Sequence, residues 1–316
     1  MKYRKLGKQG VKVSEVGLGS WLTYGGATEQ ETAQKCIEKA YDLGINFFDT
    51  ANAYARGKSE ESVCQALASY RRDSYVLATK VYFPMGDGPN DKGLSRKHLF
   101  EQCNASLKRL GTDYIDLYQA HRYDSDTPLE ETLTAFHDLT QQGKILYYGV
   151  SEWSSAQLSE AHEITRERNL HEIASNQPVY NALNRYIEKD VMATCARFGI
   201  GLVVYSPLAQ GLLTGKYKPG QPLPEDSRAA DPGQNMFLNQ GNLDQTVLEK
   251  VQKLIPIAER NGISLSQLSL AWCLRRPEVS SVIIGASRPS QVEDNAGAAG
   301  IVLAESDMTE MKAILS

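Results

Sequence analysis

The sequence predicts an α/β protein whose eight parallel strands alternate with helices and close into a (β/α)8 TIM barrel. Short apolar runs alternate with amphipathic stretches from residue 15 to the end. The runs are apolar throughout and not only at every second position, which is typical of strands buried on both faces of a parallel sheet. A chain of 316 residues has the length of one such barrel, so we expect residues 1–316 to form a single domain.

The predicted strands are short, and most of them end in a polar residue. They are Val16–Leu18, Asn46–Asp49, Val76–Lys80, Tyr114–Gln119, Ile145–Val150, Ile173–Gln177, Gly201–Ser206 and Val282–Ile284. An open, doubly wound sheet is the alternative fold, and it would need a glycine-rich turn after the first strand. The sequence Gly17-Leu18-Gly19 lacks the third glycine of that turn, which favours the barrel.

Three of the helices between these strands have clear terminal signals. They are predicted over residues 28–43, 95–110 and 128–142. Thr28 is expected to cap the first, with Glu31 three residues on, and Ser95 is expected to cap the second. Pro128 is near the first turn of the third, where proline is well tolerated. A glycine follows each of the three, as at many helix ends.

Two segments fall outside the strand–helix repeat. Residues 2–13 are expected to form a β-hairpin around Lys8-Gln9-Gly10 that closes the bottom of the barrel. Residues 207–243 are rich in Gly, Pro, Asp and Asn and predict a long loop after strand seven. Since long loops in compact domains are usually functional or disordered, we expect this one to cover a ligand.

Composition narrows the classes of partner. The net charge is −4 and no long basic run is present, which argues against nucleic acid and anionic membranes. The five cysteines are scattered, as expected of reduced thiols in the cytoplasm. The start of the chain has no signal-peptide pattern, and no apolar stretch is long enough to span a bilayer. We therefore expect a cytoplasmic protein that acts on a small molecule.

Four residues near the ends of successive predicted strands suggest an active site. Asp49 ends strand two, Lys80 ends strand three, His121 follows strand four, and Tyr54 lies just past Asp49. Polar residues at the C-terminal ends of barrel strands face the active site. Taken singly, the carboxylate could cap a helix, the lysine could be a surface charge and the histidine could be packed in the core. Their occurrence together favours catalysis.

The chemistry of these side chains fits proton transfer. A tyrosine with its usual pKa of about 10 is a poor acid at neutral pH, and an adjacent ammonium is expected to lower that value. Asp49 can pair with Lys80 and offset the cost of burying the ammonium. His121 can bond a substrate oxygen or relay a proton. The group therefore suits delivery of a proton to an oxygen that becomes negative as hydride reaches its carbon.

Over nearly its whole length the chain resembles an aldo-keto reductase. The matching segments are VGLGSW (16–21), GINFFDTANAY (44–54), LATK (77–80), SLKRLGTDYIDLYQAH (106–121), GKILYYGVS (143–151), YSPLAQGLLTGKY (205–217) and VIIGASRPSQVEDN (282–295). Within that superfamily it resembles the branch that contains potassium-channel β-subunits and their bacterial relatives. Support for that placement comes from GLSRKH (93–98), TPLEET (127–132) and LAWCLR (270–275).

The resemblance implies roles for particular residues. The catalytic tetrad would be Asp49, Tyr54, Lys80 and His121, with Tyr54 as the acid, and no metal is required. Trp21 and Tyr24 would line the substrate pocket, although plain aromatic packing is as good a reading of both. NADPH (or NADP⁺) would be bound by Trp21, Ser151, Gln177, Tyr205, Ser206, Leu208, Gln210, Gly211, Lys216, Arg228, Gly285, Ser287, Arg288, Gln291 and Asn295.

Two further expectations concern Arg288 and the residue that follows Ser151. Arg288 precedes a predicted helix, and its planar charged fork would suit the 2′-phosphate of NADPH, with a surface charge as the less favoured alternative. At Ser151-Glu152 many relatives have Ser-Asn, so a carboxylate here leaves open how the nicotinamide amide is bound.

The sequence thus predicts an NADPH-dependent oxidoreductase that reduces aldehydes or ketones to alcohols, with Tyr54 as proton donor. The alternative is an NADPH-binding regulatory protein, similar to a channel β-subunit, with weak reductase activity. A barrel lyase or isomerase without nicotinamide is a third reading. Monomer and homo-oligomer both remain open, as does the physiological substrate, because pocket loops vary within families.

Overall fold

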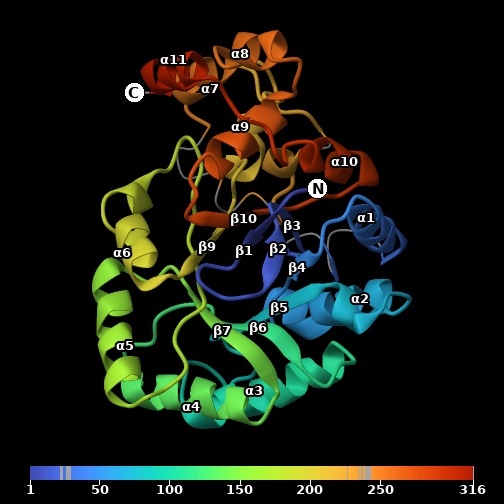
Figure 1. The fold of residues 1–316 in the computed structure, drawn as a ribbon. Helices are drawn as coiled ribbons and strands as arrows, with labels where there is room; N and C mark the ends of the chain where they lie inside the picture. Colours follow the sequence, from blue (N-terminus) through green and yellow to red (C-terminus); the bar gives the residue numbers. More distant parts are fainter. Residues whose placement is uncertain are drawn as a thin grey trace.

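The computed structural model confirms the (β/α)8 barrel. It describes residues 1–21, 24–25, 30–225, 227–233, 235, 238 and 243–315. Eight parallel strands close in the order β10-β3-β4-β5-β6-β7-β8-β9, with helices around the outside (Figure 1). The strands are β1 (Tyr3–Lys5), β2 (Lys12–Ser14), β3 (Val16–Gly19), β4 (Phe47–Asp49), β5 (Val76–Val81), β6 (Ile115–Ala120), β7 (Ile145–Ser151), β8 (Ser175–Gln177), β9 (Gly201–Tyr205) and β10 (Val279–Ile284).

Most helices follow the strands in alternation. They are α1 (Gln30–Asp42), α2 (Lys58–Leu67), α3 (Arg96–Arg109), α4 (Leu129–Gln141), α5 (Ser155–Glu167), α6 (Val191–Phe198), α7 (Gln245–Gln252), α8 (Ile255–Arg260), α9 (Leu265–Leu274), α10 (Pro289–Ala296) and α11 (Glu305–Leu315). No helix among the described residues is both long and apolar enough to cross a membrane.

Each predicted strand is present as one of β3 to β10, and the differences are at the ends. β10 begins three residues earlier than predicted because Ser280 and Ser281 interrupt the apolar run and still belong to the strand. Its register against β9 shifts between Val279 and Ser281, as at a β-bulge. β8 begins later than predicted. Ile173 precedes the strand, and its side chain packs in the hydrophobic core.

The helix caps were predicted in part. The Ser95 hydroxyl accepts a hydrogen bond from the backbone N–H of His98, which confirms the cap of α3. Pro128 is the residue just before α4. Proline is tolerated there because the N–H that it lacks would have no partner within the helix. The cap predicted at Thr28 lies outside the described residues.

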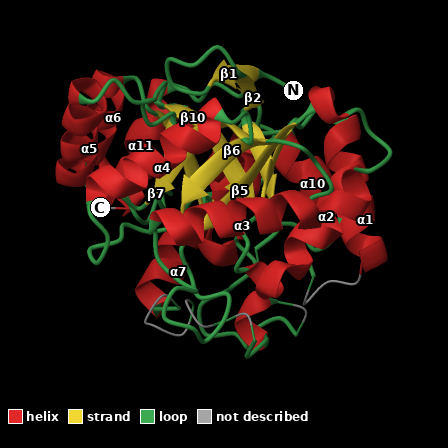
Figure 2. Ribbon diagram, turned by 90° about the horizontal axis from the view of Figure 1, so that it is seen from below, coloured by secondary structure: helices red, strands yellow, loops and turns green. Residues whose placement is uncertain are grey.

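The predicted N-terminal hairpin is present and lies across one end of the barrel. β1 and β2 pair antiparallel, with Tyr3 opposite Ser14. Leu6 and Val13 are fully buried in a cluster with apolar side chains of the barrel strands. Figure 2 shows the hairpin at one end of the barrel and α7 with its neighbouring loops at the opposite end. The hairpin therefore covers the N-terminal end of the strands and leaves the C-terminal end to the loops.

The barrel interior changes from apolar to polar along its axis. Apolar residues of several strands meet the hairpin at the N-terminal end. Toward the C-terminal end the buried side chains include Asp49, Lys80, Gln119 and Gln177. Buried polar groups are costly unless they are hydrogen-bonded, so this layer indicates a functional site.

Candidate active site

A cavity of about 1230 Å³ opens at the C-terminal end of the barrel strands. Its wall contains three of the four predicted catalytic residues and most of the predicted cofactor residues. Those in the wall are Trp21, Asp49, Tyr54, His121, Ser151, Gln177, Tyr205, Ser206, Leu208, Gln210, Gly211, Lys216, Arg228, Gly285, Ser287, Gln291 and Asn295. Residues far apart in the sequence are thus brought together around one space, which has the size of a small-molecule or cofactor site.

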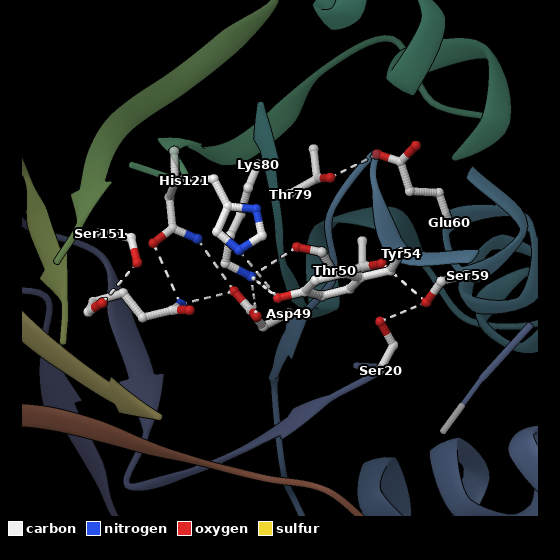
Figure 3. Close-up of polar contacts among 12 residues, drawn as sticks. Ser20, Asp49, Thr50, Tyr54, Ser59, Glu60, Thr79, Lys80, His121 and Ser151 are labelled. Atoms are coloured by element: carbon white, nitrogen blue, oxygen red, sulfur yellow. Dashed lines mark hydrogen bonds and ion pairs between the residues drawn. The ribbon is translucent and has the colours of Figure 1, made fainter. Parts of the chain in front are cut away.

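Lys80 lies behind this wall and contacts two of the other side chains predicted to be catalytic, Asp49 and Tyr54. Its ammonium is fully buried and forms an ion pair with Asp49. It also donates to the backbone carbonyl of Thr50 at 2.9 Å and to the Tyr54 hydroxyl at 3.4 Å. Figure 3 shows the ammonium at the centre of these contacts. Burial lowers the pKa of Lys80, and the pairing with Asp49 opposes that effect.

The Tyr54 hydroxyl lies between two nitrogen atoms, Nζ of Lys80 and Nε2 of His121. The second distance is 3.5 Å. Tyr54 begins a short 3₁₀ turn, η1 (Tyr54–Gly57), that follows β4. The next two residues, Ala55 and Arg56, have φ values of +46° and +53°, which is the left-handed region. Such strain at non-glycine residues costs about 1–3 kcal/mol each, and it often occurs at functional sites.

The electrostatics of Tyr54 differ from the sequence-based expectation. Burial raises the pKa of Tyr54 well above its usual value, the Asp49 charge raises it further, and the Arg122 charge opposes the shift. The expected lowering by Lys80 is not found, because the ammonium is paired with Asp49 and burial dominates. The phenol therefore keeps its proton at neutral pH, as a proton donor must before the reaction.

His121 is held in its neutral form. Burial lowers the pKa of His121 well below its usual value, and the charges of Lys80 and Arg122 lower it further. Its Nδ1 atom is buried without a hydrogen-bond partner among the described residues. A neutral imidazole can exchange a hydrogen bond with an oxygen in the cavity without adding a charge.

Asp49 is fixed by two glutamines as well as by Lys80. Its Oδ2 atom accepts from Nε2 of Gln119 at 3.1 Å and from Nε2 of Gln177 at 3.0 Å. Gln177 was predicted as a cofactor ligand, and it also bonds the Asp49 carboxylate. Gln119 was not predicted. Its signal was a polar residue within the apolar run of strand four, two positions before His121.

The carboxylate of Glu152 is engaged by the protein. It accepts hydrogen bonds from the backbone N–H of Val179 at 2.8 Å and from the Tyr186 hydroxyl. Burial and the Glu152 charge raise the pKa of the neighbouring Tyr205. The residue has a left-handed backbone with a φ of +59°. Glu152 thus ties the end of β7 to the segment after β8.

Ser151, which precedes Glu152, and the segment after β9 supply polar groups along the rest of the cavity. The Ser151 hydroxyl donates to the backbone carbonyl of Gln177 at 2.8 Å. After β9 the φ values are positive at Ser206, Ala209, Gln210 and Gly211. These four residues border the cavity. Turns of this kind direct backbone N–H groups to one side and form concavities that bind anions.

Two observations test whether this region fits a dinucleotide. The side-chain oxygen of Gln210 is buried without a hydrogen-bond partner among the described residues. Lys216 and Arg228 bring positive charge to the same wall, and burial lowers the pKa of Arg228. A half-buried guanidinium beside such a turn is what a phosphate would satisfy, and the Gln210 oxygen could accept from a hydroxyl or N–H group of the same ligand. The residues present therefore fit the predicted cofactor.

Besides Lys80, two predicted residues, Tyr24 and Arg288, lie outside the cavity wall. Tyr24 is 3% exposed and packs in the apolar core beside Cys36 of α1, so the packing reading describes it better than the pocket reading. Arg288 is exposed and precedes α10, whereas its neighbours Ser287 and Gln291 line the cavity. Because Arg288 lies outside the cavity wall, its phosphate role stays a prediction.

Sequence reasoning missed Arg122, which lines the cavity, whereas Phe83 belongs to the loop 82–94 that the sequence predicts to border the pocket. Arg122 directly follows His121, and its guanidinium carbon lies 5.6 Å from the centre of the Phe83 ring. The Phe83 ring meets the His121 ring edge-on at 4.8 Å. The adjacency of Arg122 to a predicted catalytic residue was the available signal.

Comparison with known proteins agrees with the fold. Residues 15–316 match the model of the aldo/keto reductase family. A protein of Arabidopsis thaliana, named as a probable voltage-gated potassium channel beta subunit, is 43% identical over 96% of this chain and 92% of its own length. One of Oryza sativa subsp. japonica with the same name is 41% identical over the same shares. A relative from Schizosaccharomyces pombe, whose name provisionally assigns it to these subunits, is 44% identical over 93% of this chain and 86% of its own length. The chain therefore belongs to the aldo/keto reductase family of oxidoreductases.

Proposed function

We propose that this protein is an NADPH-dependent reductase of aldehydes and ketones in which Tyr54 donates the proton. The observation that carries the proposal is the position of the Tyr54 hydroxyl. It lies 3.4 Å from the Lys80 ammonium and 3.5 Å from the His121 imidazole, in the wall of a cavity that continues to the residues suited to a dinucleotide. Family membership supports oxidoreductase chemistry.

Two groups of cavity residues would bind the two ends of the proposed cofactor. Ser151, Gln177 and Tyr205 would hold the nicotinamide end near Tyr54, since all three line the same wall. Lys216 and Arg228 would hold the phosphates. When bound, NADPH would supply the hydride that reduces the carbonyl carbon, and it would leave as NADP⁺.

The catalytic side chains act on the carbonyl oxygen. Tyr54 gives its proton to this oxygen as negative charge develops there, and positioned acid catalysis of this kind contributes about 10²- to 10⁴-fold in rate. The Lys80 ammonium stabilises the phenolate that remains, because it lies within hydrogen-bond distance of the phenol oxygen. Asp49 keeps Lys80 charged, and neutral His121 orients the substrate oxygen.

Consumption of NADPH with 4-nitrobenzaldehyde tests the proposal. Wild type should turn over, and Tyr54→Phe should lose about 100-fold or more in kcat, the share of a positioned acid. The dissociation constant of NADPH, measured by fluorescence titration, should change little in the variant because the hydroxyl is at the substrate end. Near-normal turnover of Tyr54→Phe would refute the role of the acid.

The second candidate function is regulation of a membrane channel, and the names of the relatives favour it. In that case the chain would bind NADPH and a protein partner, and turnover would be slow. Tight NADPH binding without measurable reduction of reactive aldehydes such as methylglyoxal would support this function over catalysis. Analytical ultracentrifugation in the same buffer would show whether the chain forms a homo-oligomer.

We also propose a cytoplasmic location. Five cysteines, of which four are buried, are all free in the structure. Free thiols suit a reducing compartment. Cell fractionation with an antibody to the protein would test this, and recovery in an oxidising compartment would contradict it.

A further inference from the structure

Arg122 places a positive charge in the cavity wall that the proposed catalytic steps do not use. It follows His121 at the C-terminal end of β6, and it is half-buried. Its Nη1 atom donates to the backbone carbonyl of His121 at 2.5 Å and to the Ser151 hydroxyl at 3.5 Å. These contacts hold Nη1, and no group of the described residues accepts a hydrogen bond from Nε or Nη2 of Arg122. The group is thus anchored beside the catalytic residues.

No carboxylate neutralises this charge among the residues that the structure describes. No Asp or Glu oxygen in that part of the chain lies within 4.0 Å of a guanidinium nitrogen of Arg122. The Asp49 charge is paired with Lys80. Glu152 borders the same region, but its carboxylate accepts from the Val179 N–H and the Tyr186 hydroxyl. Arg122 therefore retains the capacity to bind an anion.

The charge acts on the catalytic centre and not on a remote surface. It lowers the pKa values of His121 and Lys80, where burial is the larger cause, and it opposes the burial-driven rise in the pKa of Tyr54. The geometry agrees, because Arg122 follows His121 and its guanidinium lies over Phe83, whose ring centre is 4.8 Å from that of His121. An anion bound by Arg122 would consequently sit beside the carbonyl group that is reduced.

The surrounding wall suits a short or aromatic substrate. Phe83 lies under the guanidinium, and Trp21 and Tyr54 face each other with ring centres 6.5 Å apart. All three aromatic residues line the cavity together with Arg122. A planar guanidinium above an aromatic wall matches the geometry of a carboxylate, which it can bind through two parallel hydrogen bonds.

We propose that Arg122 is the anion-binding residue of the substrate pocket, and that the preferred substrates are aldehydes or ketones with a carboxylate near the carbonyl group. This assignment rests on the proposed reductase function. It names the substrate class, which family membership alone does not. The Lys216 and Arg228 cations, on the segment after β9, remain available for the cofactor.

Matched substrates test the proposal. A nitro group has nearly the shape of a carboxylate and no net charge, so 4-carboxybenzaldehyde is compared with 4-nitrobenzaldehyde, and the 3-substituted pair in the same way. The measured quantity is the ratio of kcat/KM for the carboxylate over kcat/KM for the nitro compound. In Arg122→Gln this ratio should fall about tenfold or more for at least one pair, as expected when a charged hydrogen bond is lost. Arg122→Lys keeps the charge but lacks the planar guanidinium, so its ratio should lie between those of wild type and Arg122→Gln.

Arg166→Gln is the charge-matched control. Arg166 is exposed in the last turn of α5, and since α5 follows β7 that turn lies toward the opposite end of the barrel. The kcat/KM ratio of Arg166→Gln should equal that of wild type. An unchanged ratio in Arg122→Gln, or an equal fall in Arg166→Gln, would overturn the proposal. A weaker NADPH affinity in Arg122→Gln with an unchanged ratio would also overturn it, because Arg122 would then serve the cofactor.

A binding measurement separates this proposal from the reductase function itself. Calorimetry compares 4-carboxybenzyl alcohol with 4-nitrobenzyl alcohol on wild type and Arg122→Gln, each saturated with NADP⁺. If neither aldehyde is reduced, the reductase function fails. Tighter binding of the carboxylate that depends on Arg122 would still support the anion site. If this preference is absent, the anion site is refuted.

Discussion

The Lys80 ammonium lies 3.4 Å from the Tyr54 hydroxyl, and it is fully buried. A lysine in such a position needs a counter-charge, and Asp49 provides it. The ion pair therefore has two separable effects. It removes the cost of a buried charge, and it places a cation beside the phenol that is proposed to lose a proton.

Substitution of Lys80 tests both effects. Lys80→Met should lower kcat by about 10²- to 10⁴-fold, because the phenolate loses its stabilising cation. It should also lower the free energy of unfolding by about 3–5 kcal/mol, since the Asp49 carboxylate remains buried and unpaired. Activity is followed by NADPH consumption, and stability by urea unfolding.

The double variant Asp49→Asn with Lys80→Met is the matched control. It removes both charges, so it should recover much of the stability and none of the activity. Recovery of activity together with stability would mean that Lys80 has no direct role at the phenol.

His121 makes stability depend on pH. Because its pKa is well below the usual value in the folded protein, the unfolded chain binds a proton that the folded chain does not. Stability should therefore fall as pH drops below about 6.5, by up to about 1.4 kcal/mol per pH unit until the folded-state pKa is reached.

The variant His121→Asn isolates this contribution. Between about pH 6.5 and pH 5 it should lose less stability than wild type, because one depressed pKa has been removed. Urea unfolding at several pH values measures the difference, and the remaining histidines cancel in the comparison. Parallel curves for the two proteins would contradict the buried neutral state of His121.

The positions of Asp49, Lys80 and His121 could be predicted because the C-terminal ends of parallel barrel strands meet at one face. The direction of the Tyr54 pKa shift could not, since it depends on how deeply the hydroxyl is buried. The depth of an aromatic side chain such as Tyr24 is set by packing of segments distant in the sequence. Residue type alone does not report it.

Other parts of the structure could not be predicted for local reasons. The start of β10 was hidden by Ser280 and Ser281, because serine is not typical of a buried strand. Gln119 appeared as one polar residue in an apolar run, and only the barrel shows that it reaches Asp49. Arg122 was overlooked although it follows His121, because adjacency to a predicted catalytic residue does not by itself distinguish a cavity charge from a surface charge.

The hairpin that closes the barrel requires glycine at position 7. Gly7 has a φ of +56°, and a Cβ atom there would lie 2.2 Å from the backbone oxygen of Gly199. Gly7→Ala should therefore destabilise the protein by about 2–4 kcal/mol, from the clash and the left-handed backbone together. Gly10→Ala is the control, since no atom lies within 4 Å of its Cβ position. Equal stability of the two variants in urea unfolding would show that the hairpin does not pack as described.

The strained turn beside Tyr54 should respond to glycine in the opposite way. Ala55 is exposed and has a φ of +46°, so Ala55→Gly relieves left-handed strain of about 1–2 kcal/mol and adds backbone entropy to the unfolded chain. Ala68 is also exposed but has a right-handed φ of −60°, so Ala68→Gly brings only the entropic cost of about 0.5–1 kcal/mol.

Ala55→Gly should consequently be more stable than Ala68→Gly by about 1–2 kcal/mol in urea unfolding. If the strain serves to fix Tyr54, kcat should fall in Ala55→Gly even as stability rises, because glycine loosens the turn that carries the phenol. Ala68→Gly should keep the wild-type kcat. A lower stability of Ala55→Gly than of Ala68→Gly would contradict the left-handed backbone at this turn, and with it the explanation of how Tyr54 is held between Lys80 and His121.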